Sequence, residues 1–208
     1  MNQNQYPLKF KNAQLHHRDI DSLNAKQWLT AEAIYFGTQY LIKEIPNGIQ
    51  VLDPSIATFL IFENDFEDLL SVQQELIGRE SIITAINDCQ NPNGSHWGVL
   101  LFNQSKFYLF DSGSNSDLQN SAELIAQKML AIINNDESLM NKDISVIKFN
   151  GVPKQTNSYD CGVYSIAIIH RLVECINKKQ EWNFQNITPD YVTNIRLELK
   201  NSIQQMLQ

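Results

Sequence analysis

Cysteine is scarce in this sequence, and the few cysteines present do not form a structural framework. The chain has 3 cysteines, at positions 89, 161 and 175. They form no Cys-x-x-Cys pair and leave one thiol over from any pairing, which argues against disulfide bonds and against a zinc site. We therefore expect no metal centre, and a protein that works in a reducing compartment.

Long hydrophobic runs and an excess of positive charge are also missing. No apolar run reaches the length of about 18 residues that a membrane span needs, and residues 1–5 are polar, so we expect neither a membrane segment nor a secretory signal. The 16 lysines and arginines are outnumbered by 23 aspartates and glutamates, giving a formal net charge of −7. This balance argues against nucleic acid or an anionic membrane as partner and leaves basic protein surfaces as candidates.

The length of 208 residues suits one domain with its own hydrophobic core. Residues 1–16 are polar and rich in Asn and Gln, so we expect a flexible N-terminal segment there, with at most a short strand at Leu8 to Phe10. Residues 17–208 show no repeat, linker or break in composition. We expect them to form a single domain that is monomeric and needs no cofactor.

Local patterns predict helices at both ends of this domain and strands in the middle. Caps and helical spacing of apolar residues indicate helices at about 30–43, 54–60, 65–74, 116–134, 163–176 and 189–206. Short runs rich in β-branched and aromatic residues indicate strands at about 82–86, 96–102, 106–110 and 144–149. This order predicts an α+β fold with a small sheet enclosed by helices.

Cys161 lies where a polar loop gives way to an apolar helix, because a nearly continuous apolar run follows from Val163 to Ile176. In the first turn of that helix, unpaired N–H groups and the positive end of the helix dipole favour a thiolate over a thiol. Gly162 lacks a side chain and would let a substrate backbone come close. The alternative is a small apolar cysteine packed at a helix start, so a nucleophile requires a base elsewhere in the chain.

His96 begins the first strand of a predicted β-hairpin, and Asp111 directly follows the second. Their midpoint in the sequence falls between Asn103 and Gln104, so a hairpin with its turn centred there places them directly opposite each other. Asp111 would then orient the imidazole, leaving its other nitrogen free to take the proton of Cys161. The alternative is that both are polar residues at strand ends that face water.

Gln155 lies in the loop that precedes Cys161. If this loop folds back, the Gln155 amide and the Cys161 backbone N–H converge on one oxygen, where each donor contributes about 3 kcal/mol to stabilising an oxyanion. The alternative is an ordinary solvated glutamine. The interpretation depends on the set of Cys161, His96, Asp111 and Gln155 together.

The order His96-Trp97, Asp111-Ser112, Gln155 and Asp160-Cys161-Gly162 resembles the ubiquitin-like-protein proteases of the Ulp/sentrin-specific type, in the adenain-like clan of cysteine peptidases. The resemblance extends from about Asp19 to Ile203. It is greatest to the small single-domain deneddylases of that family, which share the run from Asn157 to Gly162.

The resemblance implies an adenain/Ulp-like fold with a small mixed sheet, flanking helices and the catalytic cysteine at the start of a buried helix. It implies hydrolysis after the Gly-Gly tail of a ubiquitin-like modifier of the Nedd type, ubiquitin or SUMO, in precursors or conjugates. Cys161 would attack, His96 would act as base and then acid, Asp111 would orient His96, and Gln155 would help to form the oxyanion hole.

By the same resemblance, Trp97 and Trp28 would form the lid and floor of a narrow tunnel that admits only glycine. Ordinary core packing is the alternative for each tryptophan. Family members commonly follow the Trp-Leu pair with Asn-Asp, whereas this chain has Thr30-Ala31 and so lacks a carboxylate for the modifier's basic tail. The preferred modifier therefore stays open.

Two other functions and two locations remain open at this point. The same three catalytic residues occur in acetyltransferases of this clan, and a modifier-binding module without catalysis is a further alternative. The protein would act in the cytoplasm or nucleus of a eukaryotic cell, or as a bacterial effector delivered into the host cytosol.

Overall fold

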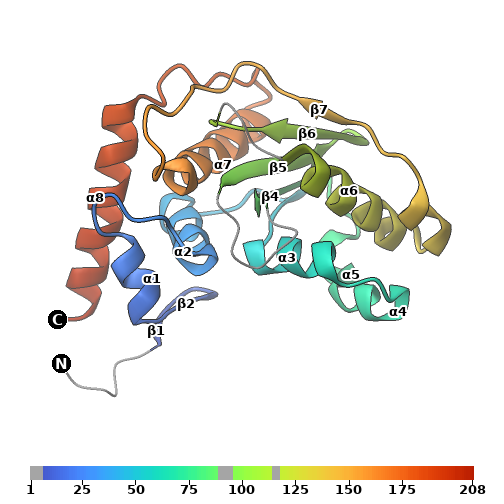
Figure 1. The fold of residues 1–208 in the computed structure, drawn as a ribbon, viewed down its shortest axis with the longest axis horizontal. Helices are drawn as coiled ribbons and strands as arrows, with labels where there is room; N and C mark the ends of the chain where they lie inside the picture. The colour runs from blue at the N-terminus through green and yellow to red at the C-terminus, as the bar shows by residue number, and fades with distance from the viewer. Residues whose placement is uncertain (1–6, 89–95, 114–117) are drawn as a thin grey trace.

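The computed structural model describes residues 7–88, 96–113 and 118–208 and has a mixed sheet between helical layers (Figure 1). The strands are β1 (Leu8–Phe10), β2 (Ala13–Leu15), β3 (Ile49–Val51), β4 (Ser81–Asn87), β5 (Trp97–Asn103), β6 (Lys106–Phe110) and β7 (Val146–Lys148). The α-helices are α1 (His17–Ser22), α2 (Ala31–Leu41), α3 (Pro54–Phe62), α4 (Phe66–Leu69), α5 (Gln73–Leu76), α6 (Leu118–Asn134), α7 (Cys161–Asn177) and α8 (Pro189–Met206). The described residues also include the 3₁₀ turns η2 (Leu70–Val72) and η3 (Glu137–Asn141).

The main sheet has the strand order β3-β4-β5-β6-β7, antiparallel in the middle and parallel at both edges. Alternate residues of each strand point to opposite faces. On β4, Ile83 and Ala85 pack with α2, α7 and α8, whereas Ile82 and Ile86 pack with α3 and α6. The sheet therefore separates two hydrophobic cores, and the α+β fold predicted from the sequence is confirmed.

Several helix starts follow the capping residues identified in the sequence. The Thr30 hydroxyl accepts the Ala33 N–H at the start of α2, and the Thr188 hydroxyl accepts the Tyr191 N–H at the start of α8. At α3 the Asp53 carboxylate caps Ser55 and proline occupies the first turn. One predicted helix differs, because 65–74 divides into α4, η2 and α5.

Residues 7–16 depart from the expected flexible segment, although the short strand considered at Leu8 to Phe10 is present as β1. Strands β1 and β2 form an antiparallel hairpin, and Ala13 and Leu15 are fully buried in the core that contains α2. Lys11 fixes the turn of this hairpin because its ammonium donates to the Gln39 and Ile42 carbonyls at the end of α2. Residues 1–6 lie outside the described residues.

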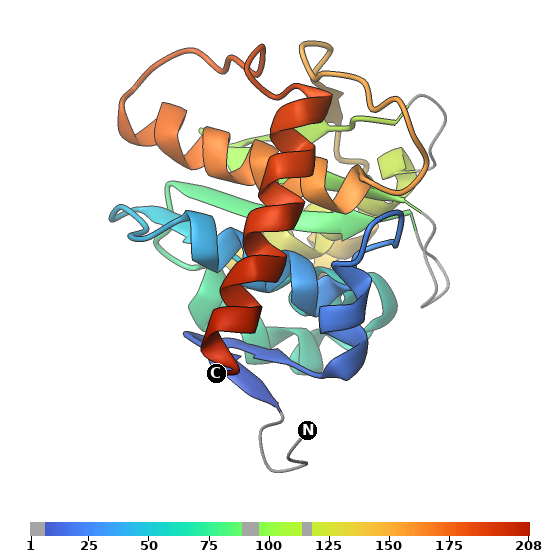
Figure 2. The ribbon, with the colours of Figure 1, turned by 90° about the vertical axis from the view of Figure 1, so that its left-hand side faces the viewer.

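Helix α8 crosses α7 and runs down past the N-terminal elements (Figure 2). Its buried side chains are spaced along one face and belong to the core around α7: Val192, Ile195, Leu199 and Ile203. Close approach is possible at Gly37 of α2, where a Cβ would lie 2.5 Å from Ile166 Cδ1 and 2.9 Å from Leu199 Cδ1. Among the described residues, no helix is both long and apolar enough to cross a membrane.

Candidate active site

The β5–β6 hairpin turns one residue later than the sequence predicted. Asn103 pairs with Lys106, and the turn residues Gln104 and Ser105 both have positive φ, at 50° and 60°. Two positive φ angles are characteristic of a type I′ hairpin turn. Asn103 stays in its strand, where its Oδ1 accepts the Ser81 hydroxyl at 2.9 Å. The predicted register is therefore wrong.

His96 and Asp111 nevertheless meet. Continuing the observed register places Asp111 beside Gly98 rather than His96, so the two side chains lie on a diagonal across the same face. The distance from His96 Nε2 to Asp111 Oδ1 is 2.7 Å, and the Gly113 N–H donates to the same oxygen at 2.7 Å. Lys148 Nζ lies 3.5 Å from Asp111 Oδ2. The carboxylate is 1% exposed, so these contacts hold it in a water-excluded position.

His96 is hydrogen-bonded to Asp111 and also interacts with Cys161. Burial lowers the pKa of His96, but the hydrogen bonds to Asp111 and Cys161 and the negative charge of both groups outweigh burial and raise it to about 9. Because Nε2 contacts Asp111, Nδ1 is the nitrogen left for the thiol. Cys161 is the first residue of α7 and is 1% exposed. The site therefore favours a protonated imidazole beside sulfur.

The loop before Cys161 folds back onto the Asp111-Ser112 segment. The Gln155 N–H donates to the Ser112 carbonyl at 2.9 Å, and the Ser112 hydroxyl donates to Gln155 Oε1 at 2.9 Å. Gln155 Nε2 donates to the Asn157 carbonyl at 2.7 Å. An amide nitrogen carries two hydrogens, so these bonds orient the side chain and leave one donor for another oxygen.

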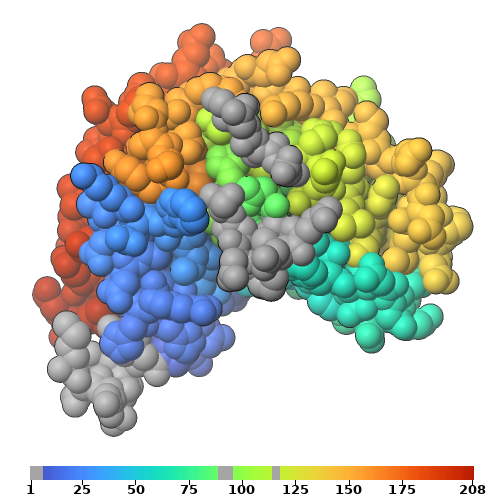
Figure 3. Space-filling view, viewed as in Figure 1, coloured from blue at the N-terminus to red at the C-terminus, as the bar shows by residue number. Residues whose placement is uncertain are grey.

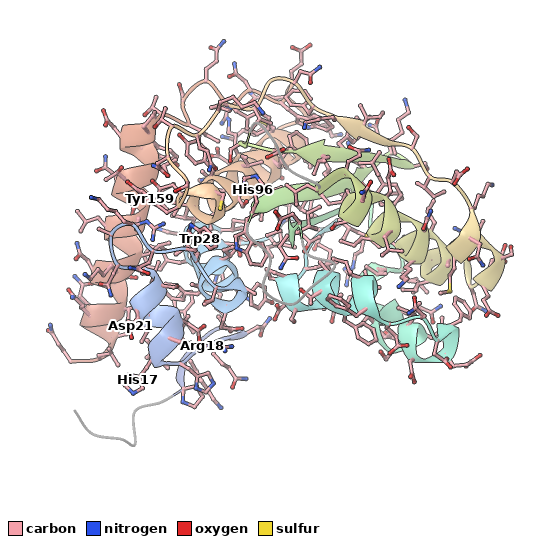
Figure 4. All side chains as sticks on the ribbon, viewed as in Figure 1. His17, Arg18, Asp21, Trp28, His96 and Tyr159 are labelled. Carbon is pink, nitrogen blue, oxygen red and sulfur yellow. The ribbon has the colours of Figure 1, made fainter. Side chains whose placement is uncertain are left out.

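The two tryptophans named from the sequence lie in different environments. Trp97 is 8% exposed, and its Nε1 donates to the Leu29 carbonyl at 3.1 Å, so it joins β5 to the segment that carries Trp28. Trp28 is 51% exposed, and its segment lies against the start of α7 in the space-filling view (Figure 3). Figure 4 shows Trp28, His96 and Tyr159 grouped around that helix start.

The role expected of Gly162 requires a correction. A Cβ on this residue would lie 2.9 Å from Leu29 Cβ and 3.1 Å from Ile34 Cδ1. The missing side chain therefore leaves room for the protein's own core and not for a substrate backbone. Glycine is needed at this position because α7 packs tightly against the Trp28-Leu29 segment.

Sequence reasoning missed Arg196, which is 6% exposed and pairs with Asp160 at 2.9 Å. A signal was present, since Arg196 falls beside Ile195 and between Val192 and Leu199 on the apolar side of α8. A charged residue at such a position needs a buried partner.

Across the residues described here, no three His, Cys, Asp or Glu side chains are grouped in a way that could hold a metal ion.

The chain is similar to known proteins over nearly its whole length. Residues 27–208 match the Ulp1 protease family, C-terminal catalytic domain. The probable sentrin-specific protease 8 of Dictyostelium discoideum is 27% identical over 94% of this chain and 96% of its own length. NEDD8-specific protease 1 of Arabidopsis thaliana is 25% identical over 96% of this chain and 93% of its own length.

A solved structure of the yeast Ulp1 protease domain in complex with Smt3, the yeast ortholog of SUMO, superimposes with a TM-score of 0.68 at 20% identity, over 97% of this chain and 87% of that chain. The fold is thus that of the Ulp1 proteases, and the resemblance read from the sequence is confirmed. The family match covers most of the chain, so the chain belongs to the Ulp1 protease family.

Proposed function

We propose that the protein is a cysteine protease that cleaves after the C-terminal Gly-Gly of a ubiquitin-like modifier, with Cys161, His96 and Asp111 as its catalytic residues. The observation that carries the proposal is the hydrogen bond between His96 and Asp111, with Cys161 close enough to the imidazole to raise its pKa. Nucleophile, base and orienting carboxylate in contact are the arrangement needed for acyl transfer through a covalent intermediate. Membership in the Ulp1 protease family supports the class of substrate.

In the proposed reaction, His96 takes the proton of Cys161, and the thiolate attacks the carbonyl carbon of the modifier's last glycine. The oxyanion that forms accepts hydrogen bonds from the free Nε2 hydrogen of Gln155 and the Cys161 backbone N–H. The imidazolium then gives its proton to the leaving amine, and the carbon–nitrogen bond breaks. Water, deprotonated by the neutral imidazole, hydrolyses the thioester and restores the thiol.

Trp97 and Trp28 are proposed to enclose the glycine tail. Trp97 is held in place by its bond to the Leu29 carbonyl, while Trp28 is half exposed at the start of α7 and available to a substrate. Two flat indole surfaces can contact an extended backbone and leave no room for a Cβ. Gly162 contributes indirectly, by letting α7 approach the segment that carries Trp28.

A Nedd-type modifier is the preferred candidate because the names of the relatives include a NEDD8-specific protease. Thr30 and Ala31 occupy the position where family members commonly carry Asn-Asp, so this position supplies no negative charge. The Thr30 hydroxyl donates to Asp19 Oδ1 at 2.8 Å, and Asp19 is 1% exposed, so this carboxylate faces the protein interior. Ubiquitin and SUMO therefore stay in the test as competing modifiers.

The proposed place of action is the cytoplasm or nucleus of a eukaryotic cell, where conjugates of such modifiers occur. Relatives from Dictyostelium and Arabidopsis support this location. Delivery into a host cytosol as a bacterial effector is the alternative. No observation on the site favours acetyl transfer or modifier binding without catalysis over hydrolysis.

The test is covalent labelling with vinyl-sulfone derivatives of Nedd8, ubiquitin and SUMO, followed by peptide mapping. Wild-type protein should react through Cys161 with at least one probe, and Cys161→Ala should not react. Cys175→Ala is the matched control, because Cys175 lies on the same helix, is fully buried and should leave labelling unchanged. Labelling of folded Cys161→Ala, or no labelling of wild type by any probe, would refute the proposal.

A further inference from the structure

Arg196 is a buried arginine that the proposed reaction does not use. It lies on α8 and donates through every one of its five N–H groups. Its Nε and Nη2 donate to Asp160 Oδ1 at 3.1 and 2.9 Å, Nη2 donates to the Tyr159 carbonyl at 3.1 Å, and Nη1 donates to the Ser22 and Asn24 carbonyls at 3.0 and 3.2 Å. One side chain thus joins α8 both to the residue before Cys161 and to the loop that leads to Trp28.

The carboxylate of Asp160 is held away from the helix that it precedes. Asp160 is the N-cap residue of α7, yet its side chain makes no capping bond. Arg196 takes its Oδ1, and Asn157 Nδ2 donates to its Oδ2 at 2.8 Å. An N-cap aspartate ordinarily accepts N–H groups of the first helical turn. Those N–H groups are therefore left for negative charge that develops at Cys161.

Arg196 also balances charge beside the nucleophile. Asp160 directly precedes Cys161 and is 6% exposed, so water screens its charge poorly. A nearby carboxylate without a cation disfavours a thiolate, since like charges within about 4 to 6 Å oppose each other. The guanidinium of Arg196 is the cation that removes this repulsion.

The same contacts continue to the proposed oxyanion donor. Asn157 Oδ1 accepts the backbone N–H groups of Tyr159 and Asp160 at 3.1 and 3.0 Å, and the Asn157 carbonyl accepts Gln155 Nε2. Movement of Asp160 would therefore shift the amide of Gln155. The loop before Trp28 is held from α8 as well, because Lys200 Nζ donates to Asn24 Oδ1 at 2.8 Å.

We propose that Arg196 is a positioning residue of the active site. It holds Asp160 away from the first turn of α7, neutralises that carboxylate beside Cys161, and anchors the loop before Trp28. The kinetic consequences rest on the proposed function, whereas the effect on thiol reactivity can be measured without any substrate.

The first test measures the rate at which iodoacetamide alkylates Cys161 at pH 6, followed by peptide mapping. Arg196→Met should slow alkylation by about tenfold, because the unpaired Asp160 carboxylate disfavours the thiolate. Adding Asp160→Asn to this variant should restore the rate to within about twofold of wild type. A purely structural arginine predicts no such rescue. An unchanged rate in Arg196→Met, or a double variant that stays slow, would overturn the electrostatic role.

The second test measures kcat and KM of the double variant with the modifier substrate that wild type cleaves. With the loop before Trp28 and the Gln155 amide less firmly held, kcat should fall by about tenfold and KM should change less. Wild-type kcat in this variant would overturn the positioning role. Should Arg196→Met fail to fold, the double variant carries the test, because it leaves no unpaired buried charge. If wild type cleaves no modifier substrate, the proposed function fails while the alkylation result still stands.

Lys128 offers a matched control for the loss of a buried cation. It is 2% exposed on α6, donates to the Ile61 carbonyl and Asn64 Oδ1 at 3.2 Å each, and also contacts the Glu63 carbonyl. All of these groups lie at the end of α3, away from α7. Lys128→Met should lower the melting temperature yet leave alkylation and kcat within about twofold of wild type. Equal losses of alkylation rate and kcat in Lys128→Met and Arg196→Met would mean that Arg196 affects the site only through the stability of the protein.

Discussion

At the scale of single residues, Gly113 decides whether His96 and Asp111 can meet. Its N–H donates to Asp111 Oδ1, and the imidazole occupies the space where a side chain would otherwise lie. A Cβ on Gly113 would lie 2.6 Å from His96 Nε2 and 3.2 Å from Asp111 Oδ1. The residue therefore combines a backbone donor with an absence of bulk.

Gly113→Ala should displace the imidazole and lower kcat by about 10²-fold, since a misplacement of about 1 Å in a catalytic group has an effect of that order. The measurement is steady-state kinetics with the substrate identified by the probe panel. Gly78→Ala is the control, because a Cβ there meets nothing within 4 Å, and its φ of 73° makes lower stability the expected effect. Full activity in Gly113→Ala would mean that His96 tolerates movement.

The raised pKa of His96 sets a pH limit on activity. The imidazole is protonated below a pH of about 9 and loses its proton above it, so the acid needed to protonate the leaving amine disappears there. We expect kcat/KM to fall as pH rises through about 9. In Cys161→Ala the His96 pKa should be lower, because the hydrogen bond and charge of Cys161 are gone; NMR titration measures this. A His96 pKa identical in both proteins would contradict the assigned cause.

The sequence led to candidate residues for the site, but not to all of their contacts. His96 contacts Asp111, and Gln155 contacts Ser112, although the register argument for His96 and Asp111 was wrong; that these residues act with Cys161 as a catalytic set stays a prediction. The contact between His96 and Asp111 forms in either register. A shift of the turn by one residue changes the strand pairing by two positions, so both side chains still lie on the same face of the sheet. Arg196 lies 174 residues from Ser22, and no local pattern encodes a contact at that separation.

At the scale of elements, the β5–β6 hairpin is a strained connection. Gln104 and Ser105 both occupy the left-handed region, where residues with a side chain are disfavoured by roughly 1 kcal/mol or more each. The turn was placed wrongly from the sequence because neither Gln104 nor Ser105 is the Asn or Gly that signals such a turn. Helix starts were more predictable, since a cap such as Thr30 acts within its own first turn.

Replacing the turn by Gln104→Asn with Ser105→Gly should stabilise the protein by about 1 kcal/mol and leave kcat unchanged. The free energy of unfolding in urea measures the first effect, and the substrate assay measures the second. Asn201→Gly, on the exposed side of α8, is the control and should destabilise by about 1 kcal/mol, because its backbone is helical. A loss of stability in the hairpin variant would rule out turn strain as described.

At the scale of the whole molecule, α8 closes the core that carries the site. Leu199 is fully buried beside α2 and α7, whereas Leu197, two residues earlier, is 56% exposed. Alternation along the strands and helical spacing predicted which residues face a core. They did not predict β3, or that β3 and β7 join the sheet edges in parallel, because those pairings depend on segments brought together only by the folded chain.

Leu199→Ala should lower the free energy of unfolding by about 2 to 5 kcal/mol, because it leaves a cavity among packed helices. Leu197→Ala removes the same atoms from the exposed side of the same helix and should change stability by less than about 0.5 kcal/mol. Thermal and urea unfolding measure both values. Equal effects would mean that α8 is not packed as described.

The contact between Arg196 and Asp160 also has a consequence for how the protein is made. The two residues are 36 positions apart, and the arginine comes later in the chain. At a synthesis rate of about 5 to 20 residues per second, the carboxylate beside Cys161 leaves the ribosome roughly 2 to 7 s before its partner. During that interval the nascent chain carries Cys161 and Asp160 without the guanidinium that pairs with the Asp160 carboxylate. On the proposed roles of Cys161 and Arg196, we expect activity only after α8 has been synthesised and packed.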